Sequence, residues 1–381
     1  MLILNNNEHI APIYNKSLSL LIGKDFAEKM SGKISLSGHQ DSEQVNRRRE
    51  LLAIEEETNK NKIIENHGKN HFKKQVMEQL FTKVNEKMDL QLDNTESLFY
   101  ETLAIKDAAP EVLEILCLKA ASIKRISPLV KLLPWLAREV VNLVNKPQYR
   151  KRADVQVTDP NLALSYIGLD NLQQVIPTFT LKYILPHSTT PFKLLKRKLW
   201  NDSLAIGLAS AALAEDTGLD RFTAFTAGMF SNIGRLVVTR YYLQTYDELH
   251  RAELQKAYDN KDKKVHDALL EFDSSPELLL EQLIARSDKI SADIVELMRF
   301  ERLQITEPIF DLAYATEYKK MCPIAQVVAK AKAYVTFRGL AREELISKSE
   351  VKLLLSQVKM TPKCLALLKK SDIDHIKLRF N

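Results

Sequence analysis

The stretch Gly228-Met229-Phe230-Ser231-Asn232-Ile233-Gly234 says more about the fold of this chain than any other. Two glycines enclose three apolar residues and one polar pair, Ser231-Asn232. Short polar side chains of this kind satisfy the backbone of a tight turn well. A neutral hydroxyl and a neutral amide are poor ligands for a catalytic metal ion. We therefore expect a tight turn whose polar pair performs no metal-dependent chemistry.

The composition favours a helical protein. The chain has 381 residues, of which 45% are hydrophobic and only 10 are glycine. Average usage of about 7% would give more than twenty glycines, so phosphate loops and many-turned barrels are disfavoured. The length suggests about two to three domains. The apolar runs are shorter than the roughly 18 residues of a membrane span, and Met1–Leu4 is too short for a signal peptide. We expect a cytoplasmic protein.

The charge is compatible with several kinds of partner, and the cysteine spacing argues against a zinc site and a disulfide framework. The net charge of +6 permits contact with an acidic partner and does not demand nucleic acid. The three cysteines, Cys117, Cys322 and Cys364, are far apart and form no CxxC pair. This spacing supports neither a disulfide framework nor a zinc site, and we expect free, buried thiols.

Helical signals dominate from residue 72 onward, and the fold class we expect is all-α. Thr190-Pro191 carries a capping hydroxyl followed by proline, which predicts a helix running through Trp200 and ending at Gly218. Asp220 and Ser275-Pro276 predict two further helix starts by the same chemistry. The segment from Val351 to Lys370 is amphipathic, and we expect it to pack on the core.

The N-terminal part differs in composition from the rest. Leu18, Leu20 and Ile22, and then Ile34 and Leu36, alternate with small or polar residues, which permits short strands. From Asp41 the chain resembles an exposed helix rich in both charges. We therefore divide the chain into a partly helical accessory segment (1–75), a helical domain (76–335) and a C-terminal helical extension (336–381).

Four blocks in this order resemble the HDOD family, the HD-related output domain of bacterial signalling proteins. They are Leu136–Tyr149, Leu162–Leu172, Leu199–Ser203 with the alanine-rich stretch that follows it, and Ala227–Gly234. The match covers roughly residues 105–335. The resemblance implies an all-helical domain with the fold of HD-type metal-dependent phosphohydrolases.

The resemblance also implies that the metal ligands are lost. HD enzymes commonly have His where this chain has Asp202, and His-Asp where it has Ser231-Asn232. We place Lys332 at or near a further Asp of those enzymes, where its charge would disfavour a cation. Asp202, Ser231, Asn232 and Lys332 are thus former metal-site positions, with no catalytic residue, no metal and no cofactor expected. On its own chemistry, Asp202 reads as a surface or helix-capping carboxylate.

The function implied by the resemblance is a non-catalytic scaffold or binding module of bacterial signalling, with protein partners of that pathway. Two alternatives stay open: a phosphohydrolase with a degenerate metal centre, and a regulator that binds a nucleotide or nucleic acid, nucleic acid being the less favoured. A solvated face is the ordinary reading of the basic residues, and an anionic ligand or partner is the other. These basic residues are Lys193, Lys196, Arg197, Lys198, Arg150, Lys151 and Arg152.

Overall fold

All the regular structure that can be described is helical. The computed structural model describes residues 9–32, 53–105, 108–150 and 156–378. The expected all-α class is confirmed within these ranges. The first helices are α2 (Ala11–Ile22), α3 (Lys24–Met30), α4 (Ala53–Leu92), α5 (Thr95–Ser97), the π-helical turn η3 (Leu98–Thr102), α6 (Ala108–Leu116), α7 (Ile123–Lys131), α8 (Pro134–Val144), α9 (Pro160–Ile167) and α10 (Leu169–Ile184).

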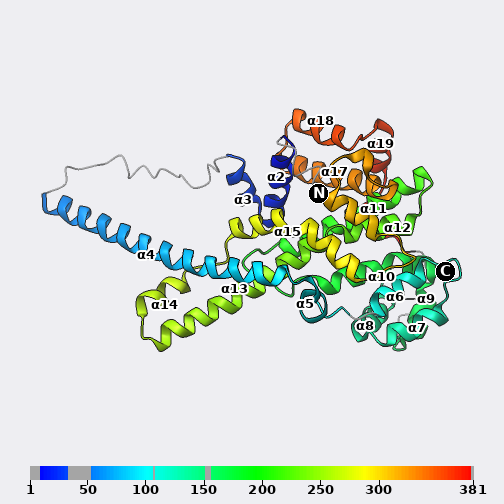
Figure 1. Cartoon of the computed structure of the whole chain (residues 1–381), viewed down its shortest axis with the longest axis horizontal. Helices are drawn as coiled ribbons and strands as arrows, with labels where there is room; N and C mark the ends of the chain where they lie inside the picture. Colours follow the sequence, from blue (N-terminus) through cyan, green and yellow to red (C-terminus); the bar gives the residue numbers. More distant parts are fainter. Residues whose placement is uncertain (1–8, 33–52, 106–107, 151–155, 379–381) are drawn as a thin grey trace.

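The second half of the chain supplies the centre of the molecule (Figure 1). Its helices are α11 (Leu195–Thr217), α12 (Arg221–Phe230), α13 (Ile233–Asp259), α14 (Lys263–Leu270), α15 (Pro276–Leu297), α16 (Thr306–Tyr314), the 3-10 turn η4 (Tyr318–Lys320), α17 (Pro323–Arg342), α18 (Lys348–Gln357) and α19 (Pro362–Lys370). Helix α11 packs against α12 and α17, and α13 packs against α15. The core therefore lies around α11, α12 and α17.

The helix boundaries near the centre follow from capping chemistry. Gly218 ends α11 in the left-handed conformation, at φ 72°, where a residue with a Cβ would be strained. The Asp220 carboxylate accepts a hydrogen bond from the Thr223 N–H at 2.7 Å and starts α12. The Ser275 hydroxyl oxygen accepts from the Leu278 N–H at 3.2 Å and starts α15. All three predicted boundaries are confirmed.

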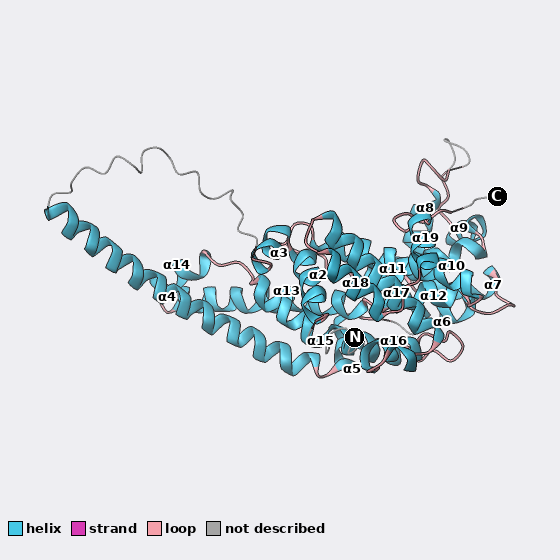
Figure 2. Ribbon diagram, turned by 90° about the horizontal axis from the view of Figure 1, so that it is seen from above, coloured by secondary structure: helices cyan, strands magenta, loops and turns pink. Residues whose placement is uncertain are grey.

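Helix α4 projects from the body of the molecule (Figures 1 and 2). Its C-terminal half packs on α13 and α14 and buries Val76, Leu80, Val84 and Met88, at i, i+4, i+8 and i+12. Its N-terminal end extends beyond these neighbours in both views. At 40 residues, α4 is about 60 Å long.

Both ends of the described chain pack on the central helices. Helix α2 contacts α11, α15 and α17, while α18 packs on α17 and α19 on α11. Leu354 and Leu368 are buried there, so the expected packing of the C-terminal helices on the core is confirmed. The Lys16 Nζ and Glu350 Oε1 atoms, 2.5 Å apart, join α2 to α18.

Two predictions about local structure are wrong. Leu18, Leu20 and Ile22 lie in helix α2 rather than in a strand, because packing of Ile13, Leu18 and Leu21 on the core overrides their short alternation. The helix predicted from Thr190-Pro191 begins only at Leu195, after a turn closed by a bond from the Leu195 N–H to the Phe192 carbonyl.

The N-terminal boundary placed at residue 75 falls inside α4, which continues through it without a break. Residues 11–22 pack on α11, α15 and α17. The strand predicted at Ile34–Leu36 and the start of the helix predicted from Asp41 lie outside the described residues. Cys364 is buried as expected, whereas Cys117 and Cys322 are half-buried, and all three thiols are free.

Candidate functional site

The two glycines of the central stretch hold helix backbones in close contact. A Cβ at Gly228 would lie 2.7 Å from Ser210 Oγ and 2.9 Å from the Cα atom of Gly207. Gly207 on α11 is equally restricted, because its Cβ would lie 2.5 Å from Met229 Cγ. Contacts below 3.0 Å are closer than carbon atoms can approach, so α11 and α12 cross at a distance that only glycine permits.

Gly234 makes the corresponding contact between α13 and α15. Its N–H donates a hydrogen bond to the Ser291 hydroxyl at 3.0 Å. A Cβ there would lie 1.9 Å from the Ser287 carbonyl oxygen, a backbone atom that cannot move independently. The glycines of the central stretch therefore fix the positions of α11, α12, α13 and α15 around Ser231-Asn232.

The polar pair itself is buried, and its two members behave differently. The Ser231 hydroxyl donates to the Gly228 carbonyl at 2.7 Å, as expected of a short polar residue in a turn. Asn232 is 1% exposed and makes no side-chain cap on α13. Among the residues that the structure describes, its Oδ1 atom has no hydrogen-bond partner, which is costly for a buried amide. Only Ser231 performs the backbone role that the sequence suggests.

An ammonium group lies directly beside this turn. Lys332, on α17, is 2% exposed. Its Nζ atom donates to the Ser231 carbonyl at 3.2 Å and lies 3.9 Å from Asp288 Oδ1 on α15. Burial lowers the pKa of Lys332 to about 8, although the nearby Asp288 carboxylate favours the charged form. The lysine is therefore mainly protonated at pH 7 and occupies the turn as a fixed cation.

These residues do not fit the metal ion of an HD-type hydrolase. No histidine lies among the described residues of the site, and the pair that would bind the ion is a hydroxyl already bonded to Gly228 and an amide. The Lys332 ammonium repels a divalent cation at the same turn. The donor set and the charge are both unsuitable.

Asp202, Arg235 and Lys332 line one cavity of about 280 Å³, where α2, α11, α13 and α17 meet. Asp202 is half-buried in the body of α11 and does not cap a helix, contrary to the expectation from sequence. Burial raises its pKa, and the positive charges of Arg235, Lys198 and Arg338 oppose that effect. Asp202 is thus an acid enclosed by basic groups.

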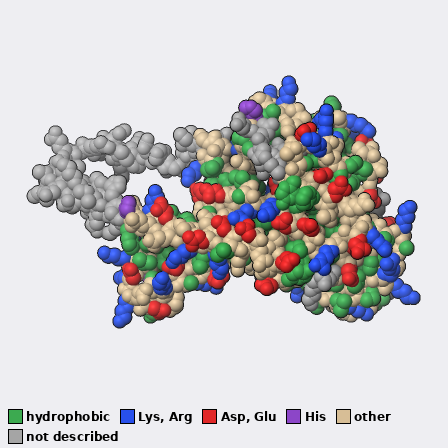
Figure 3. All heavy atoms as spheres, in the orientation of Figure 1, with side chains coloured by type: hydrophobic (Ala, Val, Ile, Leu, Met, Phe, Trp, Pro, Cys, Tyr) green, Lys and Arg blue, Asp and Glu red, His purple; other side chains and the backbone are tan. Residues whose placement is uncertain are grey.

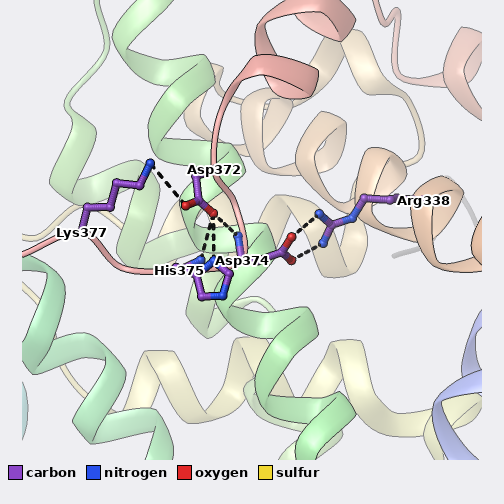
Figure 4. A network of polar contacts seen from close by, with 5 residues as sticks. All are labelled: Arg338, Asp372, Asp374, His375 and Lys377. Carbon is purple, nitrogen blue, oxygen red and sulfur yellow. Dashed lines mark hydrogen bonds and ion pairs between the residues drawn. The ribbon is translucent and has the colours of Figure 1, made fainter.

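Two ion pairs lie at the rim of this cavity. Arg338 on α17 donates to both carboxylate oxygens of Asp374, at 2.9 Å and 2.7 Å (Figure 4). Lys24 Nζ on α3 lies 2.8 Å from Oε2 of Glu343, the residue that follows the end of α17. All four residues line the cavity. Side chains from both ends of the chain therefore contribute to its rim.

The predicted basic residues do not all converge. Lys198 lines the cavity and donates to the Leu20 carbonyl, whereas Lys193, Lys196 and Arg197 are exposed outside it. Arg150 donates to the Asn145 carbonyl at the end of α8 and is not part of the cavity. Lys151 and Arg152 lie outside the described residues. Basic and acidic side chains are interspersed on the face shown in Figure 3, so no single-sign surface covers that face.

Sequence reasoning missed Arg235, Asp288 and Arg338. Arg235 directly follows Gly234, so its position next to the central stretch was a usable signal. Helical spacing places Lys332, Val335, Thr336 and Gly339 on one face of α17, and all four line the cavity beside Arg338. No sequence signal identified Asp288, because its role depends on how α15 packs against α17 and α13.

The described residues form an all-helical protein whose central turn is held by three glycines and a buried lysine. A family model, the HDOD domain, matches residues 103–300, just over half of the chain. The chain belongs to the HDOD domain family. The match begins close to the predicted residue 105 but ends at residue 300 rather than at the predicted 335, so Lys332 and Arg338 lie beyond it.

Three solved structures are similar to the chain in a general way. One is a candidate metal-dependent phosphohydrolase from Shewanella amazonensis, with 17% identity, a TM-score of 0.42, and coverage of 77% of this chain and 95% of that one. A candidate phosphohydrolase from the same organism has 16% identity and a TM-score of 0.44, covering 72% and 93%. An HDOD domain protein of unknown function from Geobacter sulfurreducens has 19% identity and a TM-score of 0.43, covering 74% and 91%.

No curated protein matches the sequence closely enough to count as a relative. Among the helices that the structure describes, none combines the length and the apolar character needed to cross a membrane.

Proposed function

We propose that this HDOD protein is a non-catalytic binding module of bacterial signal transduction, which acts through the cavity between α2, α11, α13 and α17 and through protein partners. The observation that carries the proposal is the Lys332 ammonium, 2% exposed and bonded to the Ser231 carbonyl. The resemblance implies a metal-binding carboxylate at or near position 332. This chain has the positive charge of Lys332 there instead.

The chemistry of the neighbouring groups supports this proposal. Metal-dependent hydrolysis needs a bound ion that activates water and stabilises the charge of the transition state. A lysine ammonium has no vacant coordination position and cannot generate hydroxide in this way. The cavity has a volume of about 280 Å³ and a charged lining, and its contact with α2 and with the C-terminal end allows ligand binding to be coupled to the packing of the terminal helices.

Elemental analysis tests the proposal directly. The full chain is purified without chelator, incubated with Mn²⁺ or Mg²⁺, and desalted before its metal content is measured. We expect well under one ion per chain in both cases, and no hydrolysis of bis-p-nitrophenyl phosphate.

The contrary outcome is equally well defined. One ion per chain that is lost in Asp202→Ala, but kept in the adjacent exposed-site variant Asn201→Ala, would show a working metal centre and overturn the proposal. Phosphodiester hydrolysis that follows the same pattern would establish the degenerate hydrolase instead.

A further inference from the structure

The cavity carries an excess of positive charge. Its lining includes the cations Lys24, Lys198, Arg235, Lys332, Arg338 and Arg342, and the acids Asp202, Glu343 and Asp374. Lys24 pairs with Glu343, Arg338 with Asp374, and Lys332 with Asp288. Among the described acids, none lies within ion-pair distance of Lys198, Arg235 or Arg342. Within the described part of the chain, these three cations of the cavity therefore have no ion-pair partner.

One of the acids reaches the cavity from the end of the chain. Asp374 belongs to the segment 371–378 that follows α19. Both of its carboxylate oxygens accept hydrogen bonds from the Arg338 guanidinium. This is the geometry in which arginine binds carboxylate and phosphate ligands. The chain thus supplies an anion of its own to a cationic cavity.

The segment is held in position by two other residues. The Asp372 carboxylate accepts hydrogen bonds from the N–H groups of Asp374 and His375, both at 3.2 Å, and forms a turn (Figure 4). Ile373 is 2% exposed and anchors the turn in the core. Asp372 itself faces Lys377 and His375 rather than Arg338. Asp374 alone therefore carries the contact with the cavity.

We propose that the cavity binds a small ligand bearing a phosphate monoester, and that the phosphate replaces the Asp374 carboxylate on Arg338. This inference rests on the binding function proposed above. A volume of about 280 Å³ suits a small molecule rather than a folded partner. A phosphate dianion matches the unpaired charges of Lys198, Arg235 and Arg342 better than a single carboxylate does.

The exchange is possible because the existing pair is open to solvent. The Arg338 and Asp374 side chains are 28% and 50% exposed, so water can solvate the Asp374 carboxylate when it leaves the guanidinium. A dianion that also contacts Lys198 or Arg235 gains more than the pair loses. Ligand binding then frees Asp374, loosens the segment after α19, and connects the cavity to the C-terminal end of the chain.

Isothermal titration calorimetry on the full chain tests this exchange, with inorganic phosphate, glucose 6-phosphate and AMP as probes. We expect at least one probe to bind the wild type. Asp374→Asn should bind that probe about tenfold more tightly, because the competing carboxylate is gone, and Arg338→Ala at least tenfold more weakly. Binding of inorganic phosphate shows that the phosphate group suffices, whereas binding restricted to one ester shows that the rest of the ligand contributes.

Asp372→Asn is the matched control. It removes one negative charge from the same segment and keeps the oxygen that accepts the two N–H groups, so its affinity should equal that of the wild type. Equal tightening in Asp372→Asn and Asp374→Asn would indicate a general charge effect and overturn the proposal.

Absence of binding to every variant, or Arg338→Ala binding as tightly as the wild type, would also overturn the proposal. Because metal content is measured separately, a failed exchange leaves the non-catalytic assignment standing, and stoichiometric metal removes that assignment by itself.

As a second readout, the bound probe should accelerate tryptic cleavage after Lys377 in the wild type and leave the cleavage rate of Asp374→Asn unchanged. An unchanged cleavage rate in a wild type that binds the probe contradicts displacement of the segment.

Discussion

Helix α11 takes part both in the crossing at Gly207 and Gly228 and in the cavity beside Asp202, yet these two regions tolerate substitution very differently. At the crossing, a single added carbon would collide with a neighbouring helix backbone. In the cavity, charged side chains meet an open volume of about 280 Å³ and can be exchanged without disturbing a backbone. A substitution at the crossing therefore changes how helices pack, whereas a substitution in the cavity changes its charge.

The largest expected effect comes from Gly234→Ala, which tests the packing side of this comparison. The added Cβ would lie 1.9 Å from the Ser287 carbonyl oxygen, so α13 and α15 must separate. We expect a loss of about 3 kcal/mol or more in the free energy of unfolding, or failure to fold. Urea denaturation measures the loss.

Gly339→Ala is the control, because nothing lies within 4 Å of the Cβ position there. Gly339 lies in the last turn of helix α17, and this change should leave stability unchanged or raise it by up to about 1 kcal/mol. Equal losses at residues 234 and 339 would contradict the distinction between crossing and cavity.

Lys332→Met tests the charge beside the turn through its pH dependence. The folded-state pKa of about 8 lies below the unfolded value, so between these two values the unfolded chain binds the extra proton. Stability from this group therefore rises with pH in that window. The stability of the wild type relative to Lys332→Met should rise by on the order of 2 kcal/mol between pH 8 and 10.

Comparing the two proteins at each pH cancels the titration of the thiols and phenols, which they share. A constant difference across the window would show that the lysine titrates like an exposed one.

Asp202→Asn gives the smallest effect and probes the acid within the cavity. Burial raises the pKa of Asp202 in the folded chain, so the unfolded chain loses this proton first. The wild type should therefore lose stability relative to Asp202→Asn as the pH rises above about 3.9, the usual pKa of an aspartate. Thermal unfolding between pH 3 and 6 measures the trend, and the opposite slope would mean that the basic neighbours outweigh burial.

Much of the fold follows from local signals in the sequence. Gly218, Asp220 and Ser275 each mark a helix end through a backbone preference or a side-chain bond that involves only near neighbours. Leu18, Leu20 and Ile22 gave the wrong prediction because their pattern is short and packing on distant helices decides their conformation.

The candidate site was only partly predictable. Asp202, Ser231 and Lys332 stood out through the resemblance, and the structure places Asp202 and Lys332 in one cavity. Asp374 and Lys24 could not be found, because they reach the cavity from opposite ends of the chain. Their roles depend on tertiary packing rather than on spacing.

The positive charge at the central turn is part of the polypeptide chain, because it is the ammonium group of Lys332. An ion held by coordination is shared among all the proteins that compete for it, and its occupancy varies with the metal available. A lysine is present in every copy from the moment of translation. With a pKa of about 8, most copies carry the charge at pH 7. The charge of this side chain therefore depends on the proton concentration and not on the supply of metal.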